Sequence, residues 1–574
     1  MNILGISCYY HDSAAALIVD GKIVAAVANE RFSRKKHDSD FPALAIDFCL
    51  KEAGIAIKKV DKIVFYEKPF LKFERITLTA LATAPSGRKN FVNAYKTWLK
   101  SKLWIKSQLM KELGVASGKI AFCHHHTSHA AASFYTSGFK RAALLTVDGV
   151  GEWTTTAWGT ADGNNLKLTH EIPFPHSLGL MYSTFTQFLG FRINNGEFKV
   201  MGMSPYGTPR YKKKVEKLIQ QSDDGSFKLD MSYFTFHLTD DISYSPKFIK
   251  LFGKPQDPAK TDVVTQKYAD IAASIQVVLE EKLLVIAKHV RNTTGESNLC
   301  LAGGVALNGV SNWNLFQKAG FKNIWIHPAA GDDGGALGAA LYYFHTVLKK
   351  DVSSRFASPY LGSENTEEDI QKFINATKIK AKHLTDKELV KTICADLVKG
   401  NVIGVVRGKF EWGPRALGAR SIIADPRSKR MKDIVNKKIK FRESFRPFAP
   451  VALYDSAHTY FDFARDDGSV EKTPPRILEY MLGVVPVQKK YRSKLGAVTH
   501  VNGSARPQLI RRSTNSFYYD VVKAFGAKTG IEVLLNTSFN LKGEPIVTTC
   551  EDAYKTFMES GIDTLVLGNY VIRK

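Results

Sequence analysis

Hydrophobic and polar positions at the start of the chain predict three short strands. Residues 2–32, "NILGISCYYHDSAAALIVDGKIVAAVANERF", form apolar runs that are interrupted by a polar loop at residues 10–13 and by an Asp20-Gly21 pair. An Asp-Gly pair between alternating apolar runs is typical of a β-hairpin. The same pattern returns over residues 141–172, "RAALLTVDGVGEWTTTAWGTADGNNLKLTHEI", with a loop at residues 148–151 and a turn at Asp162-Gly163. Two copies of one unit predict a duplicated α/β fold.

Glycine-containing loops follow several of these strands and are suited to bind a nucleotide. Small residues in the loop at 148–151 let backbone N–H groups approach a phosphate closely. In "NLCLAGGVALNGVSNWNLF", a glycine pair between a strand and a helix gives a nucleoside room against the backbone, although such a pair alone is weak evidence. Two facing lobes would then hold one nucleotide. The expected nucleotide-binding residues are Asp148, Gly149, Gly151, Gly303 and Gly304.

The pattern changes near residue 355. The polar stretch "SSRFASPYLGSENTEEDI" leads into a new series that begins with the helix pattern "DKELVKTICADLVKG" and the strand pattern "VIGVVRG". A chain of 574 residues is also too long for one ordinary core. We therefore expect two domains, residues 1–355 and 356–574.

Composition places the chain among globular proteins. It has 44% hydrophobic and 24% charged residues, and no apolar run approaches the roughly 20 residues that span a bilayer. The first residues enter a strand pattern without a basic leader, so we expect a cytoplasmic protein. The six cysteines are scattered without a CxxC pair, which indicates neither a disulfide scaffold nor a cysteine zinc site, and predicts reduced, buried thiols.

The net charge is strongly positive. Lys and Arg total 80 against 55 acidic residues, which gives +25. Such a charge attracts nucleic acid, anionic membrane or phosphorylated substrates, but it also fits a lysine-rich solvated surface. Charge alone does not choose among these interpretations.

Four of the 15 histidines stand within six positions, in "FCHHHTSHAAASF". His125 and His129 are four apart in a helix-compatible stretch, so both would project from one helical face. Asp148 and Asp332 follow apolar strands, and together the four predict a site with two nitrogen and two oxygen ligands. Such a site suits iron, zinc or manganese, and the residue types do not decide between these metals. For the histidine pair alone, chance spacing on a helix surface or in a core is an equally open alternative.

Several long motifs resemble the NodU/CmcH family of O-carbamoyltransferases. The motifs of the first half are "HHHTSHAAASF", "VDGVGEWTTTAWG", "GEFKVMGMSPYG", "LAGGVALN" and "GDDGGALGAAL". The resemblance implies an actin-like (ASKHA) ATPase fold there, related to the tRNA threonylcarbamoyladenosine transferase. The second half carries "WGPRALGARSIIADPR", "KIKFRESFRPFAP" and "LLNTSFNLKGEPIV", which resemble the YrdC-like α/β domain of that family. The resemblance covers nearly the whole chain.

The resemblance implies that the second domain makes carbamoyl-adenylate from carbamoyl phosphate and ATP, with Mg accompanying the ATP. Guanidinium groups pair bidentately with phosphate, and lysine supplies a point charge. Arg420 and Arg442 are nearby alternatives, any one arginine could form an ordinary surface ion pair, and dense basic residues also fit an RNA-binding patch. The residues that match the family are Arg415, Lys440, Arg446, Arg506 and Ser538.

In the first domain the resemblance implies iron(II) on His125, His129, Asp148 and Asp332. Asp333 is an alternative to Asp332. His11 matches a general base on the acceptor hydroxyl, a role that suits a pKa of about 6.5. Lys36, or its neighbour Lys35, would stabilise charge on the carbamoyl or phosphate oxygens. Asn308 would face the nucleoside.

The expected activity is therefore transfer of a carbamoyl group to a hydroxyl of a small-molecule natural product or glycan. Three alternatives are a tRNA threonylcarbamoyl-type transferase, a sugar kinase-like ATPase and a nucleic-acid-binding protein without enzymatic activity. The second domain and the histidine pair argue against them, so we expect neither a nucleic-acid nor a membrane partner. The acceptor is not readable, and a homodimer is the commonest arrangement for a soluble oligomer.

Overall fold

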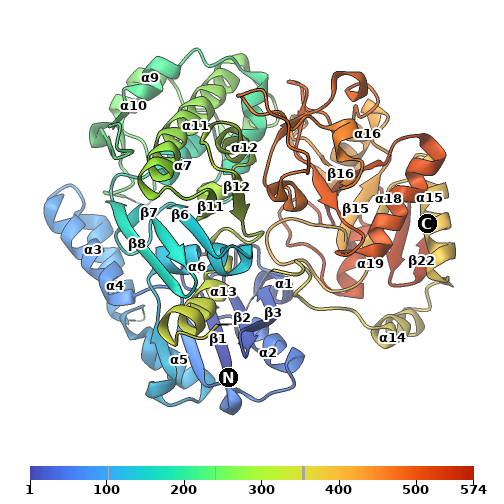
Figure 1. The fold of residues 1–574 in the computed structure, drawn as a ribbon, viewed down its shortest axis with the longest axis horizontal. Helices are drawn as coiled ribbons and strands as arrows, with labels where there is room; N and C mark the ends of the chain where they lie inside the picture. The colour runs from blue at the N-terminus through green and yellow to red at the C-terminus, as the bar shows by residue number, and fades with distance from the viewer. Residues whose placement is uncertain (101, 240, 352–355) are drawn as a thin grey trace. The chain divides into compact units, whose positions relative to one another are not determined.

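In a computed structural model the protein is described over residues 1–574 except 101, 240 and 352–355. The chain divides into two compact units (Figure 1). Unit 1 comprises Met1–Ala28 with Ser39–Phe356, and unit 2 comprises Asn29–Asp38 with Ala357–Lys574. The sequence predicted a division near residue 355, but it did not predict that Asn29–Asp38 would belong with the second unit.

Two five-stranded sheets of the same topology form the frame of unit 1. The first has the order β3-β2-β1-β4-β5, and the second has the order β8-β7-β6-β11-β12. In each sheet the first three strands are antiparallel and the last three are parallel. The predicted duplicated α/β fold of the actin-like type is confirmed. The strands are β1 (Asn2–Ser7), β2 (Ala14–Val19), β3 (Lys22–Ala28), β4 (Lys62–Phe65), β5 (Ile120–Phe122), β6 (Arg141–Val147), β7 (Thr154–Asp162), β8 (Asn165–Pro173), β11 (Asn298–Ala302) and β12 (Asn323–Ile326).

The hairpin between β2 and β3 turns at the predicted Asp-Gly pair. Asp20 and Gly21 both have positive φ, 47° and 78°, which a tight two-residue turn between twisted strands requires. The turn after β7 likewise contains Gly163 at a φ of 52°.

Two helices fill the space between the two sheets of unit 1. Helix α13 (Asp332–Tyr342) packs on the first sheet, α6 (His125–Ser137) packs on the second, and the two helices pack against each other. Further helices of unit 1 are α2 (Ala43–Glu52), α3 (Pro69–Ala82), α4 (Arg88–Lys100), α5 (Ile105–Leu113), α7 (Leu178–Phe188), α8 (Glu197–Met203), α9 (Lys212–Glu216), α10 (Pro246–Phe252), α11 (Gln266–Thr294) and α12 (Gly309–Lys318). A short hairpin joins β9 (Ile219–Gln221) to β10 (Phe227–Leu229).

Glycines allow α13 to approach its neighbours closely. A Cβ atom on Gly338 would lie 1.8 Å from the carbonyl oxygen of Ser128 on α6. A Cβ atom on Gly5 of β1 would lie 1.8 Å from the carbonyl oxygen of Ala336 on α13. Neither position has room for a side chain, because backbone atoms cannot rotate away. The contact fixes the start of α13 relative to α6.

We expect Gly338→Ala to destabilise unit 1 strongly. Relieving the clash with Ser128 requires the two helices to separate, and overpacking of this kind costs about 3 kcal/mol. The midpoint of thermal unfolding should fall by about 5 °C. The matched control is Gly118→Ala, because a Cβ on Gly118 meets no described atom within 4 Å. Equal midpoints for the two variants would show that α6 and α13 are not closely packed.

An eight-stranded sheet forms the frame of unit 2. Its order is β13-β22-β21-β14-β15-β20-β16-β19, and α15 packs with α18 over a core that includes Leu389, Ile393, Val522 and Phe525. The strands are β13 (Lys382–His383), β14 (Ile403–Val406), β15 (Arg420–Ala424), β16 (Ala449–Leu453), β19 (Gln508–Ile510), β20 (Val533–Ser538), β21 (Thr564–Leu567) and β22 (Tyr570–Arg573), and β17 (Val485–Pro486) pairs with β18 (Ser504–Ala505). Helices are α1 (Glu30–Ser33), α14 (Glu367–Thr377), α15 (Asp386–Val398), α16 (Lys429–Val435), α17 (Ala457–Tyr460), α18 (Ser516–Thr529) and α19 (Cys550–Met558). Its YrdC-like identity stays a prediction.

The segment Asn29–Asp38 is held in unit 2 by specific contacts. The guanidinium of Arg34 donates to the carbonyls of Ile546 and Pro545, at 2.6 and 3.1 Å. The Thr548 hydroxyl donates to the Arg31 carbonyl at 2.7 Å, and the Arg31 guanidinium lies over a phenylalanine ring of the same unit. These contacts are polar and arise between distant positions of the chain, so no local pattern predicts them.

Two predictions from composition can be compared with the structure. The six cysteines are all described, and all are free and buried, as expected. None of the described helices combines the length and the apolar character needed to cross a bilayer.

Candidate functional site

The two predicted histidine ligands come from the first turns of α6. His125 and His129 lie four positions apart on one face of the helix, and each is 1% exposed. The carboxylate of Glu152 accepts hydrogen bonds from the backbone N–H of His125 at 3.0 Å and of Lys68 at 2.8 Å. A carboxylate at this position satisfies an unpaired amide and complements the positive end of the helix dipole. Glu152 therefore fixes where α6 begins.

Asp148 follows the last residue of β6 and is held by the glycine turn after β11. Its Oδ1 accepts a hydrogen bond from the backbone N–H of Gly304 at 2.7 Å, and its Oδ2 lies 3.0 Å from His125 Nε2. Gly303 has a φ of +94°, and a Cβ there would lie 2.3 Å from the carbonyl oxygen of Val147. The glycine pair thus lets the turn approach β6 closely enough to orient Asp148.

Asp332 is the first residue of α13 and faces the histidines. Its Oδ1 lies 3.7 Å from His125 Nε2 and 3.6 Å from His129 Nε2. The neighbouring Asp333 instead accepts a hydrogen bond from the N–H of Gly334 in its own helix. Of the two adjacent carboxylates, the structure brings Asp332 into the group.

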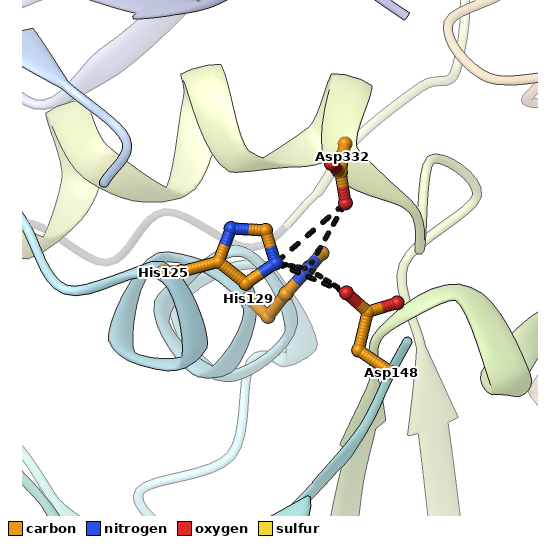
Figure 2. A group of neighbouring side chains, drawn as sticks. All are labelled: His125, His129, Asp148 and Asp332. Atoms are coloured by element: carbon orange, nitrogen blue, oxygen red, sulfur yellow. Dashed lines mark hydrogen bonds and ion pairs between the residues drawn. The ribbon is translucent and has the colours of Figure 1, made fainter. Parts of the chain in front are cut away.

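One ligand atom from each of His125, His129, Asp148 and Asp332 lies within 4.8 Å of all the others (Figure 2). The two Nε2 atoms are 3.0 Å apart. Asp332 Oδ2 is buried and has no hydrogen-bond partner among the described residues. Two imidazoles and two carboxylates that converge in a buried space match the ligand preferences of zinc, iron or manganese. The donor set therefore fits a divalent transition metal ion.

The electrostatics of the group favour a cation. Burial opposes a charge on His129, but Asp148 and Asp332 outweigh burial and raise its pKa to about 10. Burial raises the pKa of the Asp148 carboxyl, yet the two histidines outweigh it and hold that pKa well below its usual range. The carboxylates thus retain a proton on the imidazole in the absence of metal, and a bound metal ion would replace that positive charge.

His11 lies at the accessible edge of the group, in the loop between β1 and β2. Its Nε2 is 3.7 Å from Asp332 Oδ2, its Nδ1 is 2.9 Å from Asp12 Oδ2, and its side chain is 25% exposed. Burial lowers its pKa, but Asp332, Asp12 and Asp148 outweigh burial and raise it to about 9. The expectation of an ordinary pKa near 6.5 is therefore wrong for the chain without a cation.

The predicted nucleotide-binding residues surround the same group. A Cβ on Gly151 would lie 3.0 Å from His125 Cβ, so this glycine makes room for the imidazole. The Gly149 carbonyl accepts a hydrogen bond from the Ser177 hydroxyl at 2.7 Å. Asn308 caps the N-terminus of α12 through the N–H of Ser311. Contact of these residues with a nucleotide stays a prediction.

Unit 2 contains a group of buried and half-buried cations. Arg415 lies in the loop between β14 and β15, and Arg506 lies between β18 and β19. Burial and the charge of Arg446 lower the pKa of Arg415 to about 10. Burial, Arg415 and Arg446 lower the pKa of Arg506. The cation group is Arg415, Lys440, Arg442, Arg446 and Arg506.

Lys440 is anchored at the end of β20. Its Nζ lies 2.6 Å from the Ser538 carbonyl oxygen and 2.7 Å from Asn540 Oδ1. The Ser538 hydroxyl donates to the same Asn540 oxygen at 2.7 Å. Burial and the nearby charges of Arg442, Arg446 and Lys36 lower the pKa of Lys440. The structure therefore brings Lys440 and Ser538 together, with neutral oxygens in place of a carboxylate partner.

Like charges in a buried space are stabilised by an anionic ligand. Arg415 Nε is buried and has no hydrogen-bond partner among the described residues. Arg420 donates to the carbonyls of Gly408, Ala419 and Ser363 through its terminal nitrogens, and its buried Nε likewise has no hydrogen-bond partner among the described residues. A buried guanidinium nitrogen without a hydrogen-bond partner, within a group of cations that repel one another, suits a phosphate ligand, which accepts hydrogen bonds and neutralises charge.

Comparison with known proteins gives the family. The protein family described as "Carbamoyltransferase N-terminus" matches residues 2–341, and the family described as "Carbamoyltransferase C-terminus" matches residues 394–574. The chain belongs to the carbamoyltransferase family. It is accordingly an enzyme that transfers carbamoyl groups.

Relatives of this carbamoyltransferase match along its full length. An uncharacterized protein of Synechocystis sp. is 47% identical and aligns over 100% of this chain and 97% of its own. The nodulation protein NolNO of Sinorhizobium fredii is 35% identical over 99% of this chain and 79% of its own. Among solved structures, component A of the (R)-2-hydroxyglutaryl-CoA dehydratase of Acidaminococcus fermentans covers 60% of this chain and 97% of its own, with a TM-score of 0.33 and 16% identity.

Lys36 of the carbamoyltransferase does not lie in unit 1, where the sequence placed it. It belongs to the segment Asn29–Asp38 of unit 2, and its Nζ is 3.5 Å from the carbonyl oxygen of Glu544. Its charge lowers the pKa of Lys440 in the same unit. Lys36 therefore contributes to the cation group. The earlier expectation followed from its early place in the chain, which the crossing segment overrides.

Two residues that support these sites were missed in the sequence. Glu152 holds the start of α6, and Glu411 accepts backbone hydrogen bonds from Leu417, Ala419 and Arg420 in the loop that carries Arg415. The sequence does show Glu152 directly after the "DGVG" loop and Glu411 directly before "WGPRALG". Their partners are backbone amides at distant positions, so spacing alone does not reveal the contacts.

Proposed function

We propose that this carbamoyltransferase makes carbamoyl-adenylate from carbamoyl phosphate and ATP in unit 2 and transfers the carbamoyl group to a hydroxyl of a small-molecule acceptor in unit 1. The observation that supports this most directly is the presence of two chemically different sites in one chain. Unit 2 has a group of buried and half-buried cations that lower one another's pKa, and Arg415 Nε has no hydrogen-bond partner among the described residues, which suits phosphate chemistry. Unit 1 has two imidazoles and two carboxylates arranged for a metal ion, with His11 at their accessible edge.

In the activation step, water first cleaves carbamoyl phosphate to carbamate and inorganic phosphate; an oxygen of the carbamate then bonds to the α-phosphorus of ATP, and pyrophosphate leaves. Negative charge develops on the phosphate oxygens, and fixed cations stabilise it without rearranging. Arg415 and Arg506 would pair with phosphate oxygens, and Lys440, anchored by Ser538, would supply a point charge. Arg446 and Lys36 would add positive potential, and Mg would accompany the ATP.

In the transfer step, the acceptor hydroxyl oxygen bonds to the carbamoyl carbon, and AMP leaves. The hydroxyl proton would pass to neutral His11, whose position at the edge of the group suits contact with an acceptor; a bound cation would favour the neutral imidazole by offsetting the carboxylates that raise its pKa. His125, His129, Asp148 and Asp332 would hold the metal ion, which we propose to be iron(II) from the family resemblance. When bound, the ion would supply a Lewis acid for oxygens of the adenylate. An adenylate is a mixed anhydride, so orientation and charge stabilisation suffice without a covalent enzyme intermediate.

The proposal predicts pyrophosphate–ATP exchange that depends on carbamoyl phosphate. Purified protein is incubated with ATP, Mg and labelled pyrophosphate, with and without carbamoyl phosphate and without acceptor. Label should enter ATP only when carbamoyl phosphate is present, and carbamoyl-adenylate should be detected by mass spectrometry. Exchange tests the activation step alone, so it requires no knowledge of the acceptor.

The alternative activities give different results in the same experiment. ATP hydrolysis to ADP without carbamoyl phosphate would favour the kinase-like ATPase over our proposal. Absence of any ATP turnover would contradict the assignment of unit 2. A tRNA threonylcarbamoyl-type transferase would instead require RNA in the transfer step, which can be tested by adding total tRNA to preformed threonylcarbamoyl-adenylate.

A further inference from the structure

Helices α3 and α4 expose an apolar surface that packing within unit 1 does not explain. Phe70 is 69% exposed, Leu81 is 67% exposed and Trp104, just beyond α4, is 55% exposed. Figure 1 shows α3 and α4 side by side at the edge of unit 1. We name this surface the α3–α4 face. Its exposed apolar residues are Phe70, Leu78, Leu81, Val92, Tyr95, Leu99 and Trp104.

The exposed positions follow helical spacing, so they form one side of each helix. Val92, Tyr95 and Leu99 are separated by three and four residues, which places them on one stripe of α4. A different side of α4 packs inward, where Trp98 is 5% exposed and its ring centroid lies 5.9 Å from that of Phe73. The pair of helices α3 and α4 therefore has one apolar side that is buried and a second apolar side that is exposed.

Positive charge predominates around this face. Residues 76–111 contain seven Lys or Arg and no Asp or Glu. The exposed lysines of this stretch and its continuation into α5 are Lys96, Lys100, Lys106 and Lys111. The exposed acidic residues at its borders are Glu74 on α3 and Glu112 on α5. Apolar residues together with lysines on the same outer surface are typical of helices that lie on anionic membranes.

We propose that the α3–α4 face binds the surface of an anionic phospholipid bilayer. The aromatic and leucine side chains would enter the interface, and the Trp104 ring can do so without an unpaired donor, because its N–H donates to the Leu99 carbonyl at 2.8 Å. The lysines would contact lipid phosphates. These exposed side chains do not have to match a partner of fixed shape, because the lipids of a fluid bilayer rearrange around them.

Other occupants match the face less well. A second copy of this chain would bring two groups of like charge together, which opposes association. A protein partner would need acidic groups placed opposite the lysines, because charges across a protein interface are complementary. Nucleic acid would pair with the lysines but would leave the exposed Leu, Val and Phe side chains in water.

This inference revises the expectation of no membrane partner, which rested on the lack of a spanning segment. Surface binding requires no helix that crosses the bilayer, so it agrees with the described helices. It does not depend on the proposed carbamoyl-transfer mechanism.

Vesicle co-sedimentation of the full chain tests the proposal. We expect binding to vesicles of equal parts phosphatidylglycerol and phosphatidylcholine, and at least about a hundredfold weaker binding to pure phosphatidylcholine, because each contacting lysine contributes about fivefold. Phe70→Ser/Leu81→Ser/Trp104→Ser should weaken binding about tenfold or more. The matched control is Val263→Ser/Val470→Ser/Val501→Ser, since these residues are 66%, 60% and 58% exposed elsewhere. The control should bind as well as the unchanged chain.

A second pair of variants tests the charge. Lys96→Gln/Lys100→Gln/Lys106→Gln/Lys111→Gln should weaken binding by about fivefold per lysine. The control with the same charge change is Lys380→Gln/Lys387→Gln/Lys391→Gln/Lys399→Gln, which should bind normally. Equal losses in test and control variants would overturn the proposal, because net charge rather than this face would then cause binding.

Three other outcomes would also overturn it. The first is the absence of vesicle binding by the unchanged chain. The second is a dimer in solution, measured by light scattering, that Phe70→Ser/Leu81→Ser/Trp104→Ser converts to a monomer without any vesicle binding. The third is binding to RNA, but not to vesicles, that is lost when the four lysines of α4 and α5 are replaced.

Discussion

Replacing Asp332 with asparagine should abolish metal binding, whereas the same change at Asp333 should leave it intact. The two residues are neighbours at the start of α13, so each change removes a negative charge from the same helix N-terminus. Only Asp332 has an oxygen within 3.7 Å of both histidine Nε2 atoms. An asparagine there replaces a charged ligand by a neutral amide, and we expect metal affinity to fall more than about 100-fold.

The measurement is metal content after exposure to iron(II), zinc or manganese and dialysis under anaerobic conditions. We expect one metal ion per chain in the unchanged protein and in Asp333→Asn, and close to none in Asp332→Asn. Thermal unfolding gives a second readout, because a ligand that binds only the folded state raises the midpoint. Metal should raise the midpoint of Asp333→Asn and not that of Asp332→Asn. Loss of metal in both variants would indicate that the charge at the helix start, rather than ligation, holds the ion.

The comparison of Asp332 with Asp333 also shows how much of this site was readable in the sequence. Helical spacing placed His125 and His129 on one face, and the strand pattern placed Asp148 at the end of β6. Both inferences use local periodicity, which the fold preserves. The choice between the adjacent carboxylates required the direction of each side chain at the start of α13. That direction depends on the close packing of α13 on α6 through Gly338, a contact between distant parts of the chain.

Lys36 illustrates the opposite case. Its position in the chain, eight residues after the end of β3, suggested unit 1. The segment Asn29–Asp38 instead lies in unit 2, held by Arg31 and Arg34. Hydrophobic patterning predicts elements and their order, and it predicted the duplicated sheets. Hydrophobic patterning does not predict with which unit a short polar segment packs, because this depends on hydrogen bonds to carbonyls that are distant in the sequence.

Replacing Arg506 with alanine should stop carbamoyl-adenylate formation without weakening the fold. We expect carbamoyl-phosphate-dependent pyrophosphate–ATP exchange to fall about a thousandfold, the effect of removing one fixed donor from a transition state. Metal content in unit 1 should not change. The control is Arg512→Ala, an exposed arginine that pairs with Asp520 at 2.6 Å, which should leave exchange unaltered.

The thermal midpoint distinguishes a ligand-binding arginine from a structural one. Burial, Arg415 and Arg446 lower the pKa of Arg506, so its charged form is less favourable in the folded protein than in the unfolded chain. Removing that charge should therefore raise the midpoint by about 1–3 °C in the absence of ligand. Pyrophosphate should raise the midpoint of the unchanged protein, because it neutralises the cation group, and should have little effect on Arg506→Ala. A lower midpoint together with a normal response to pyrophosphate would assign Arg506 to the structure of unit 2 and remove it from the proposed site.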